Sequence, residues 1–372
     1  MSGVFLGKCK NYNSKKLYNV IKQGFNSLGG IDFVRGKKIL LNPNLLAPVS
    51  PEKGVTTHPE VIRAVGRLIQ QNGGEVFIGD SPGMGTLKTL YKITGIKKIA
   101  DEEDFEIPDF KNSMMIKNPD GVLVKKFEIA KAYEQVDYIF SLAKLKTHGM
   151  TYYTGAAKNL FGMIPGLLKP PFHYKFSKKQ NFADMLIDLN FLLKPKLSII
   201  DGIMAMEGDG PRNGNLRNLK AIIISKDSIA ADTVACKLVN INPKKIVTNI
   251  AGAKRGLGTM DLNNINIYGR KIKDLEIKNF KHPPREVNLD NLIPVPGFLK
   301  KIIEYFLVPK PKFYHDKCIL CKECVKVCPS KPKSLSVKNN KIEINRKSCI
   351  KCFCCQEMCP VGAIEPKKFI LN

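Results

Sequence analysis

The sequence predicts an α/β protein with a mostly parallel sheet and helices on both faces, followed by a small cysteine-rich domain. Two observations support this fold class. Short aliphatic runs alternate with amphipathic helical patterns before residue 290, which is typical of strand–helix–strand units. Nine of the 11 cysteines then lie between Cys318 and Cys359. The chain is long enough for a substantial core and for about two domains.

A proline-bracketed stretch separates the two regions. It runs from Pro294 to Pro311, directly before the cysteines. We therefore expect an α/β domain over residues 1–290, a linker over 291–311 and a second domain over 312–372.

Five short β-branched or aliphatic runs are the predicted strands. Runs of this kind are typical of strands that are buried on both faces of a parallel sheet. They are Lys38–Leu41, Glu75–Gly79, Tyr138–Leu142, Leu197–Ile200 and Ala221–Ile224.

Two helices are predicted most clearly between these strands. The first begins with a capping-box pair, Thr57 and Glu60, has Pro59 in its first turn, and ends at Gly73-Gly74. The second starts near residue 181 and ends at Pro195. Its apolar face would contain Phe182, Leu186, Leu189 and Leu193.

The chain is strongly basic. Its 60 Lys and Arg residues against 33 Asp and Glu give a formal net charge of +27, which favours anionic ligands or partners. The excess is spread along the chain and no nucleic-acid motif accompanies it, so we interpret it mainly as a solvated surface and predict no nucleic-acid partner. The sequence contains no apolar segment of membrane-spanning length and no leader pattern near Met1. We expect a cytoplasmic protein without a membrane span.

Two cysteine runs share the spacing C-x2-C-x2-C-x3-C-P. Such clustering in a cytoplasmic protein indicates metal binding rather than disulfides. One loop of this spacing presents three thiolates to a 4Fe–4S cluster, while the fourth cysteine reaches the partner cluster. Two complete copies are poorly explained by zinc ribbons. We therefore predict two clusters, one held by Cys318, Cys321, Cys324 and Cys359, the other by Cys349, Cys352, Cys355 and Cys328.

Both runs resemble bacterial-type two-cluster ferredoxins. The resemblance implies a small, pseudo-symmetric α+β domain that passes one electron at a time. Cys354 is additional to the pattern, and we interpret it as a packed neighbour rather than a ligand. Lysines around the runs favour an acidic redox partner. They are Lys317, Lys322, Lys326, Lys347 and Lys351.

Polar residues follow the predicted strands. Ligands of open α/β sheets bind beyond the carboxyl ends of the strands, so we expect these loops to meet in one crevice. Lysines there would bind an anionic small molecule, and histidines and carboxylates would transfer protons. The catalytic candidates are Lys144, Lys146, His148, Glu207 and Asp209.

The same crevice suggests a second metal site of unspecified identity, formed by His58, His148 and Asp201. Simpler interpretations exist, since His58 could begin a helix and Asp201 could cap a turn. Gly83 and Gly85 are a weak phosphate-loop signal, because the Walker lysine and the third glycine of a dinucleotide fingerprint are missing. We therefore do not predict NAD binding.

The order of several blocks in the large domain resembles the domain of unknown function 362 family, over roughly residues 35 to 260. The blocks are Thr57–Glu60, Gly79–Gly83, Lys144–His148, Lys158–Gly162 and Asp201–Pro211. Members of that family are sometimes fused to ferredoxin modules. The resemblance implies no settled reaction, so it leaves the substrate open.

Two functional hypotheses follow. The first is an iron–sulfur oxidoreductase that delivers electrons to an anionic substrate or a metal at the strand-end crevice. The fusion of the cysteine-rich domain to the α/β domain favours it, because covalent attachment gives the clusters a high effective concentration at the crevice. The alternative is a non-catalytic electron carrier, or an assembly or docking factor for an acidic redox partner.

Overall fold

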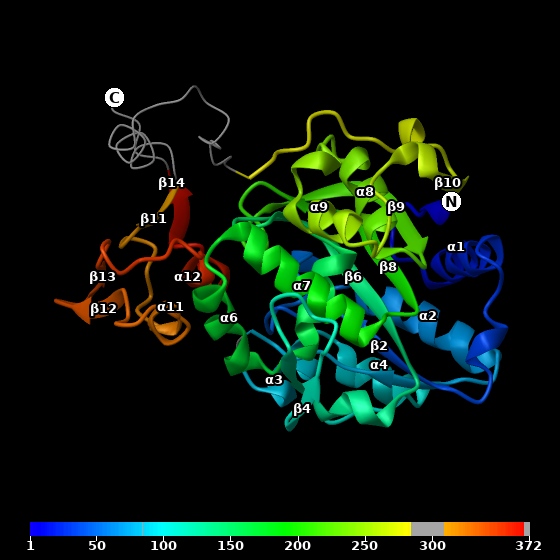
Figure 1. Cartoon of the computed structure of the whole chain (residues 1–372), viewed down its shortest axis with the longest axis horizontal. Coiled ribbons are helices and arrows are strands. Elements are labelled where there is room, and N and C mark those ends of the chain that lie inside the picture. The colour runs from blue at the N-terminus through cyan, green and yellow to red at the C-terminus, as the bar shows by residue number, and fades with distance from the viewer. Residues whose placement is uncertain (84, 284–308, 368–372) are drawn as a thin grey trace.

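The computed structural model describes residues 1–83, 85–283 and 309–367 (Figure 1). We call residues 1–283 the α/β body and residues 309–367 the cysteine-rich region. Most of the predicted linker at 291–311 lies outside the described residues. Of its last residues, Lys310 and Pro311 already belong to strand β11, Lys310–Phe313.

An eight-stranded sheet forms the centre of the α/β body, with the order β10-β1-β9-β8-β6-β2-β3 and β7 paired to β6. Strands β3, β2, β6 and β8 run parallel, as do β1 and β10. The bounds are β1 Ser2–Lys8, β2 Lys38–Pro43, β3 Glu75–Ile78, β6 Tyr138–His148, β7 Tyr152–Thr154, β8 Leu197–Glu207, β9 Asn215–Ser225 and β10 Ile265–Gly269. The predicted mostly parallel sheet is confirmed.

Strand β9 departs from the predicted parallel arrangement, since it runs antiparallel to both β8 and β1. Only residues 208–214 connect β8 to β9. A connection this short makes a hairpin, because a parallel crossover needs about a dozen residues or more.

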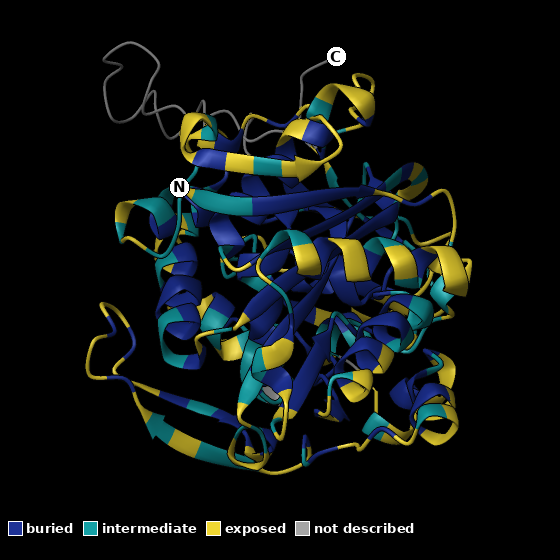
Figure 2. Ribbon diagram, turned by 90° about the vertical axis from the view of Figure 1, so that its right-hand side faces the viewer, coloured by how far each residue is buried: buried dark blue, intermediate teal, exposed yellow. Residues whose placement is uncertain are grey.

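Both faces of the sheet are buried, which explains the continuous apolar runs. In β2, Ile39 and Leu41 pack into the core on one face, whereas Leu40 packs into the core on the other. Figure 2 shows the buried strands behind helices that expose their outer sides.

Helices cover both faces of the sheet. On one face lie α1 Ser14–Ser27, α2 Pro59–Gln71, α3 Leu87–Ile93 and α4 Ile96–Glu103. The other face carries α5 Ala156–Asn159, α6 Lys169–Lys175, α7 Lys179–Leu193, α8 Ser228–Leu238 and α9 Val247–Lys254. A separate antiparallel hairpin pairs β4 Ser113–Lys117 with β5 Lys126–Ala130. The predicted apolar face of α7 is confirmed, because Phe182, Leu186, Leu189 and Leu193 are all buried. In the described parts of the chain, no helix is long and apolar enough to cross a membrane.

Helix α2 begins differently from the prediction. Its N-cap is His58, whose Nδ1 accepts a hydrogen bond from Glu60 N at 3.2 Å. The Thr57 hydroxyl instead donates to Leu142 O at 2.7 Å and accepts from Asn44 N at 3.0 Å. The predicted Thr57–Glu60 capping box is therefore wrong, because the threonine ties the preceding loop to β6.

Strands β6 and β8 continue beyond their predicted ends. Their pairing extends from Lys144 opposite Asp201, across an irregularity, to Lys146 opposite Met206. Lys144, Lys146 and His148 thus alternate along a strand and share one side of it. The sequence predicts these residues in a loop, whereas they lie in β6 because its pairing with β8 continues past the predicted strand ends.

The cysteine-rich region repeats one pattern twice. Strand β11 pairs with β14 Ile364–Lys367, and β12 Leu335–Lys338 pairs with β13 Lys341–Ile344, both antiparallel. Each cysteine run leads into a short helix, α11 Glu323–Lys326 and α12 Cys354–Met358. This is the small α+β arrangement expected for the region.

Candidate functional site

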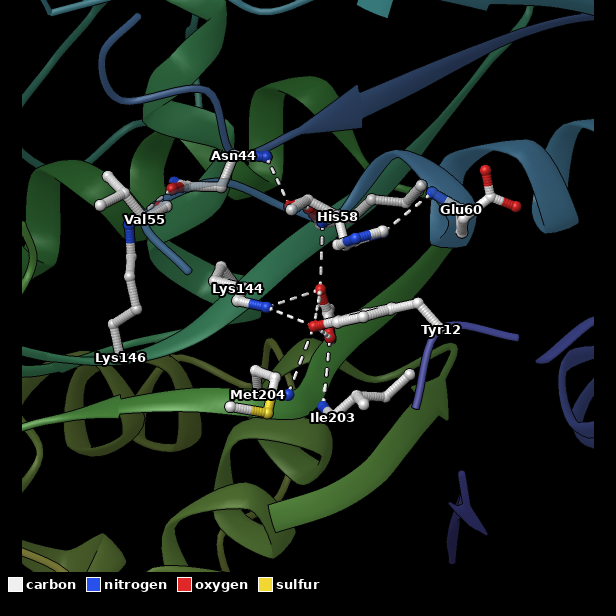
Figure 3. A network of polar contacts seen from close by, with 12 residues as sticks. Tyr12, Asn44, Val55, His58, Glu60, Lys144, Lys146, Ile203 and Met204 are labelled. Atoms are coloured by element: carbon white, nitrogen blue, oxygen red, sulfur yellow. Dashed lines mark hydrogen bonds and ion pairs between the residues drawn. The ribbon is translucent and has the colours of Figure 1, made fainter. Parts of the chain in front are cut away.

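A buried network surrounds Asp201 where β8 pairs with Lys144 of β6 (Figure 3). Lys144 Nζ lies 2.8 Å from Asp201 Oδ2 and 2.8 Å from the Tyr12 hydroxyl. The hydroxyl donates to Asp201 Oδ1 at 3.0 Å, and His58 N donates to Oδ2 at 3.1 Å. The Tyr12 and His58 rings stack with centroids 3.6 Å apart. This network joins four distant segments, and every charged group in it has a partner.

The network decides the role of two predicted site residues. Burial lowers the pKa of Lys144, and Asp201 opposes that shift. Lys144 is neutralised by Asp201, so it is a structural residue rather than a free cation. His58 begins a helix and stacks on Tyr12, which was its simpler interpretation.

The structure gives the three residues of the predicted second metal site, His58, His148 and Asp201, different partners. His58 and Asp201 belong to the network above, whereas His148 points toward Glu357 of α12. Over residues 1–83, 85–283 and 309–367, no three His, Cys, Asp or Glu side chains are grouped to hold a single metal ion.

Lys146 is also buried. Its Nζ donates to Asn44 Oδ1 at 2.7 Å and to Val55 O at 2.6 Å, as Figure 3 shows. Burial lowers its pKa well below the usual value, and the nearby cations Lys158 and Lys144 add to that effect. Lys146 therefore positions Asn44, which lines the cavity described below.

His148 connects the α/β body to α12. Its Nδ1 accepts from Met150 N at 3.1 Å and Thr151 N at 3.3 Å, so the proton of the neutral ring is on Nε2. Nε2 lies 3.0 Å from Glu357 Oε1. Burial lowers the pKa of His148; burial would raise that of Glu357, but His148 and Lys158 bring it down to about 2. A neutral imidazole here faces a carboxylate.

Asp209 contacts the same helix, because its Oδ1 accepts from Gln356 Nε2 at 2.7 Å. Burial, with a smaller effect of Glu365, raises the pKa of Asp209 to about 6. Glu207 lies elsewhere: its Oε2 accepts from Lys281 N at 3.0 Å. Of the two predicted carboxylates, only Asp209 therefore contacts α12.

A cavity of about 80 Å³ lies between the α/β body and the cysteine-rich region. That is room for several waters or a small molecule. Its wall combines strand-end loops, α5 and α6 with parts of α11 and α12. The residues include Asn44, Leu46, Asp80, Ser81, Lys158, Phe161, Lys169 and His173 from the body, and Val327, Cys354, Glu357 and Met358 from the cysteine-rich region.

Two lysines line the cavity in different ways. Lys169 Nζ donates to Ser81 O, and its pKa falls to about 8 because burial outweighs the opposing charge of Asp80. Lys158 Nζ has no hydrogen-bond or ion-pair partner among the residues that the structure describes. Burial lowers the pKa of Lys158, with Glu357 opposing. An anion bound in the cavity would supply the opposite charge that favours the protonated form of Lys158.

Asp80 and His173 complete the polar wall. Burial raises the pKa of Asp80 to about 6, although its Oδ2 accepts from Leu45 N at 2.7 Å. His173 stacks on Phe182 with centroids 4.6 Å apart, and its buried Nδ1 has no partner in the described chain. Burial lowers the pKa of His173 to about 4, so the ring is a neutral hydrogen-bonding group at pH 7.

The residues that matter most here are not among the catalytic candidates that the sequence indicates. Lys158 and Asp80 stand in the strand-end blocks but were not among the catalytic candidates. Lys169 and His173 follow those blocks without a motif of their own. Glu357 offered a signal, since it is an acidic residue inside the second cysteine run.

The cysteines fit iron–sulfur clusters chemically. None of the 11 cysteines forms a disulfide, so their sulfurs are available as ligands. The two runs turn through left-handed residues at matching positions, Leu320 (φ 52°) and Lys322 (φ 62°) in the first, Lys351 (φ 56°) and Phe353 (φ 60°) in the second. Equivalent backbone turns present thiolates in the same way, as two similar cofactors require.

Comparisons with known proteins agree with these features. A family model described as a domain of unknown function (DUF362) matches residues 39–237, and a 4Fe-4S dicluster domain model matches residues 310–360. The second match confirms the prediction of two 4Fe–4S clusters.

A curated relative, the thylakoid-associated protein sll1697 of Synechocystis sp., is 30% identical over 311 residues, which are 83% of this chain and 95% of the relative. Among solved structures, the lactate racemase apoprotein of Thermoanaerobacterium thermosaccharolyticum has a TM-score of 0.40 at 15% identity, covering 63% of this chain and 56% of that one. A Thermotoga maritima protein has a TM-score of 0.37 at 16% identity, with coverages of 62% and 60%.

Proposed function

This chain belongs to the domain of unknown function 362 family and carries a two-cluster 4Fe–4S region, and we propose that it transfers electrons to a small anionic compound bound in the cavity. The observation that carries this proposal is Lys158. Its ammonium group lines a cavity shared by both regions and lacks a partner in the described chain. Lys158 is half-buried, and the nearby charge of Glu357 offsets only part of the cost of its burial, so an anion in the cavity would stabilise the ammonium group directly.

We assign the cluster ligands as the spacing predicts. Cys318, Cys321, Cys324 and Cys359 would hold one cluster, and Cys349, Cys352, Cys355 and Cys328 the other. The clusters supply one electron at a time. The division into an α/β domain (1–290), a linker (291–311) and a ferredoxin-like domain (312–372) is part of this proposal.

The position of the cavity supports electron delivery. Val327 precedes Cys328 and Cys354 precedes Cys355, so two cavity-lining residues directly adjoin assigned ligands. Cys354 itself packs in an apolar group with Val327 and Met358. A compound in the cavity would thus lie beside the cysteine-rich region with water largely displaced.

The residues of the body have separable roles in this proposal. Lys158 binds the anion, and Lys169, held by Ser81 O, adds a second positive charge. His148 would hold a proton on Nε2, which lies 3.0 Å from Glu357 Oε1. The apolar side of the cavity, including Leu46 and Phe161, would accept a hydrocarbon part of the compound.

The test uses holoprotein that has been reduced under anaerobic conditions and freed from excess reductant. Reoxidation by a panel of small carboxylates and oxyanions is followed through the visible absorbance of the clusters. Lys158→Met is compared with Lys22→Met, which changes an exposed lysine of α1. A charge-assisted hydrogen bond contributes about 1.5–3 kcal/mol, so we expect Lys158→Met to slow reoxidation roughly 10- to 100-fold for the active anion.

Anion binding is measured separately, from changes that each anion causes in the electron paramagnetic resonance spectrum of the reduced protein. If no anion distinguishes Lys158→Met from Lys22→Met by either measurement, the anion site is refuted. The electron-carrier interpretation would then be the better account of this chain.

A further inference from the structure

The cysteine-rich region contains two equivalent faces. Aligning the cysteine runs by their spacing places α11 in register with α12. The matching left-handed residues, Lys322 (φ 62°) and Phe353 (φ 60°), stand directly before the two helices. Each position on one face therefore has a geometric counterpart on the other, and the two faces can be compared residue by residue.

The α/β body covers the α12 face. Gln356 donates to Asp209 at 2.7 Å, Glu357 lies 3.0 Å from His148, and Met358 O accepts from Arg212 Nη1 at 3.1 Å. Gln356, Glu357 and Met358 are all buried. In Figure 1, α12 lies toward the body, between it and the rest of the cysteine-rich region.

Four positions of the first run, Ile319, Cys321, Lys322 and Lys326, are exposed, whereas Val325 and Val327, in register with Gln356 and Met358, are not. Ile319 is 61% exposed, and Cys321 is the one exposed cysteine of the 11. Lys322 and Lys326 are exposed beside them, and Lys326 is the residue in register with the buried Glu357.

We propose that this face, formed by Ile319, Cys321, Lys322 and Lys326, is the docking surface for an acidic redox protein. The covered face shows the rule: Glu357 of α12 and the cation Lys158 of the α/β body line the same cavity and attract each other. Where the first face carries Lys326 instead of glutamate, the complementary partner is acidic. This inference does not depend on the cavity or its anion.

The surrounding charges support an acidic partner. Lys317, Lys331 and Lys333 are exposed around the same run, against the acidic residues Asp316 and Glu323. Ile319 would supply an apolar contact at the centre of a basic rim, as transient interfaces require. Cys321 belongs to one assigned ligand set, so a partner on this face would approach that cluster closely.

The first measurement is cross-linking of the wild-type holoprotein to an acidic 2Fe–2S ferredoxin with a carbodiimide, which joins carboxylates to lysines. We expect cross-linked lysines to be concentrated at Lys317, Lys322 and Lys326. Cross-links concentrated on the α/β body would overturn the proposal, and so would an absence of cross-links at low ionic strength.

The second measurement compares Lys322→Glu/Lys326→Glu with a matched control, Lys15→Glu/Lys22→Glu, on an exposed side of α1. We expect the first double variant to slow cluster reduction by the reduced 2Fe–2S ferredoxin at least tenfold at low salt and to lose most of its salt dependence. Reduction by dithionite, which needs no docking, should stay unchanged. Equal slowing by both double variants would refute a specific surface, because it would report net charge alone.

Discussion

Replacing Asp201 with alanine removes the acceptor at the centre of the strand-end network. The carboxylate accepts hydrogen bonds from Lys144 Nζ, the Tyr12 hydroxyl, His58 N and Ile203 N. Lys144 and Asp201 side chains are 1% and 0% exposed, so water cannot take the place of the lost partner. The ammonium of Lys144 would remain buried, with only the Tyr12 hydroxyl beside it.

The magnitude follows from this burial. Removing one partner of a buried ion pair costs about 3–5 kcal/mol, a large share of the 5–15 kcal/mol that stabilises a typical domain. Lys144→Met should cost a similar amount. Combining it with Asp201→Ala should cost clearly less than the sum, because neither charge is then left unpaired.

Urea unfolding under anaerobic conditions, followed by far-ultraviolet circular dichroism, measures these free energies of unfolding. Tryptophan fluorescence cannot serve, since the chain has no Trp. The matched control is Lys97→Met/Asp101→Ala, an ion pair whose side chains are 60% and 58% exposed, and it should cost below about 1 kcal/mol. A cost below about 1 kcal/mol for Asp201→Ala, or full additivity in the double variant, would refute a structural role for the network.

Three further predictions concern the cavity and the cysteines. In the folded protein, burial lowers the pKa of His173 to about 4, so protonation of the unfolded chain destabilises the wild type as the pH falls below about 6.5. Between pH 7 and pH 5, the free energy of unfolding of His173→Phe should therefore rise by about 2 kcal/mol relative to that of the wild type. A difference between the two proteins that does not change with pH would contradict this. Gly162→Ala would place a Cβ 1.8 Å from Asp80 Oδ1, so we expect a loss of about 1–3 kcal/mol in urea unfolding, whereas a neutral result would mean that the loop moves freely. Cys354→Ala should keep about eight irons per chain while Cys355→Ala loses iron, and equal losses would make Cys354 a ligand.

Much of the fold could be predicted because its signals are local. The five predicted strands all exist, and α7 buries the apolar side that its spacing indicated. The exceptions have non-local causes. Thr57 does not cap α2 because its hydroxyl bonds to Leu142 of β6, 85 positions away along the chain.

The candidate site was predictable in its location and less so in its roles. Lys144 and Lys146 do lie at the carboxyl ends of the parallel strands, yet both already have buried partners. Lys158, at the start of the following block, is the lysine of these three that has no partner in the described chain. All three are lysines that follow the same predicted strand, so the sequence could not tell which of them would find a buried partner.

The sequence by itself determined the two clusters and the α/β class, because cysteine spacing and apolar periodicity act within a few residues. Only the tertiary structure decided which charges are neutralised. Lys144 bonds to Tyr12 across 132 positions, and His148 of β6 meets Glu357 of the cysteine-rich region. The energy of a buried charge depends on the partners that folding brings within about 3–4 Å and on the exclusion of water, and neither is encoded in the spacing of neighbouring residues.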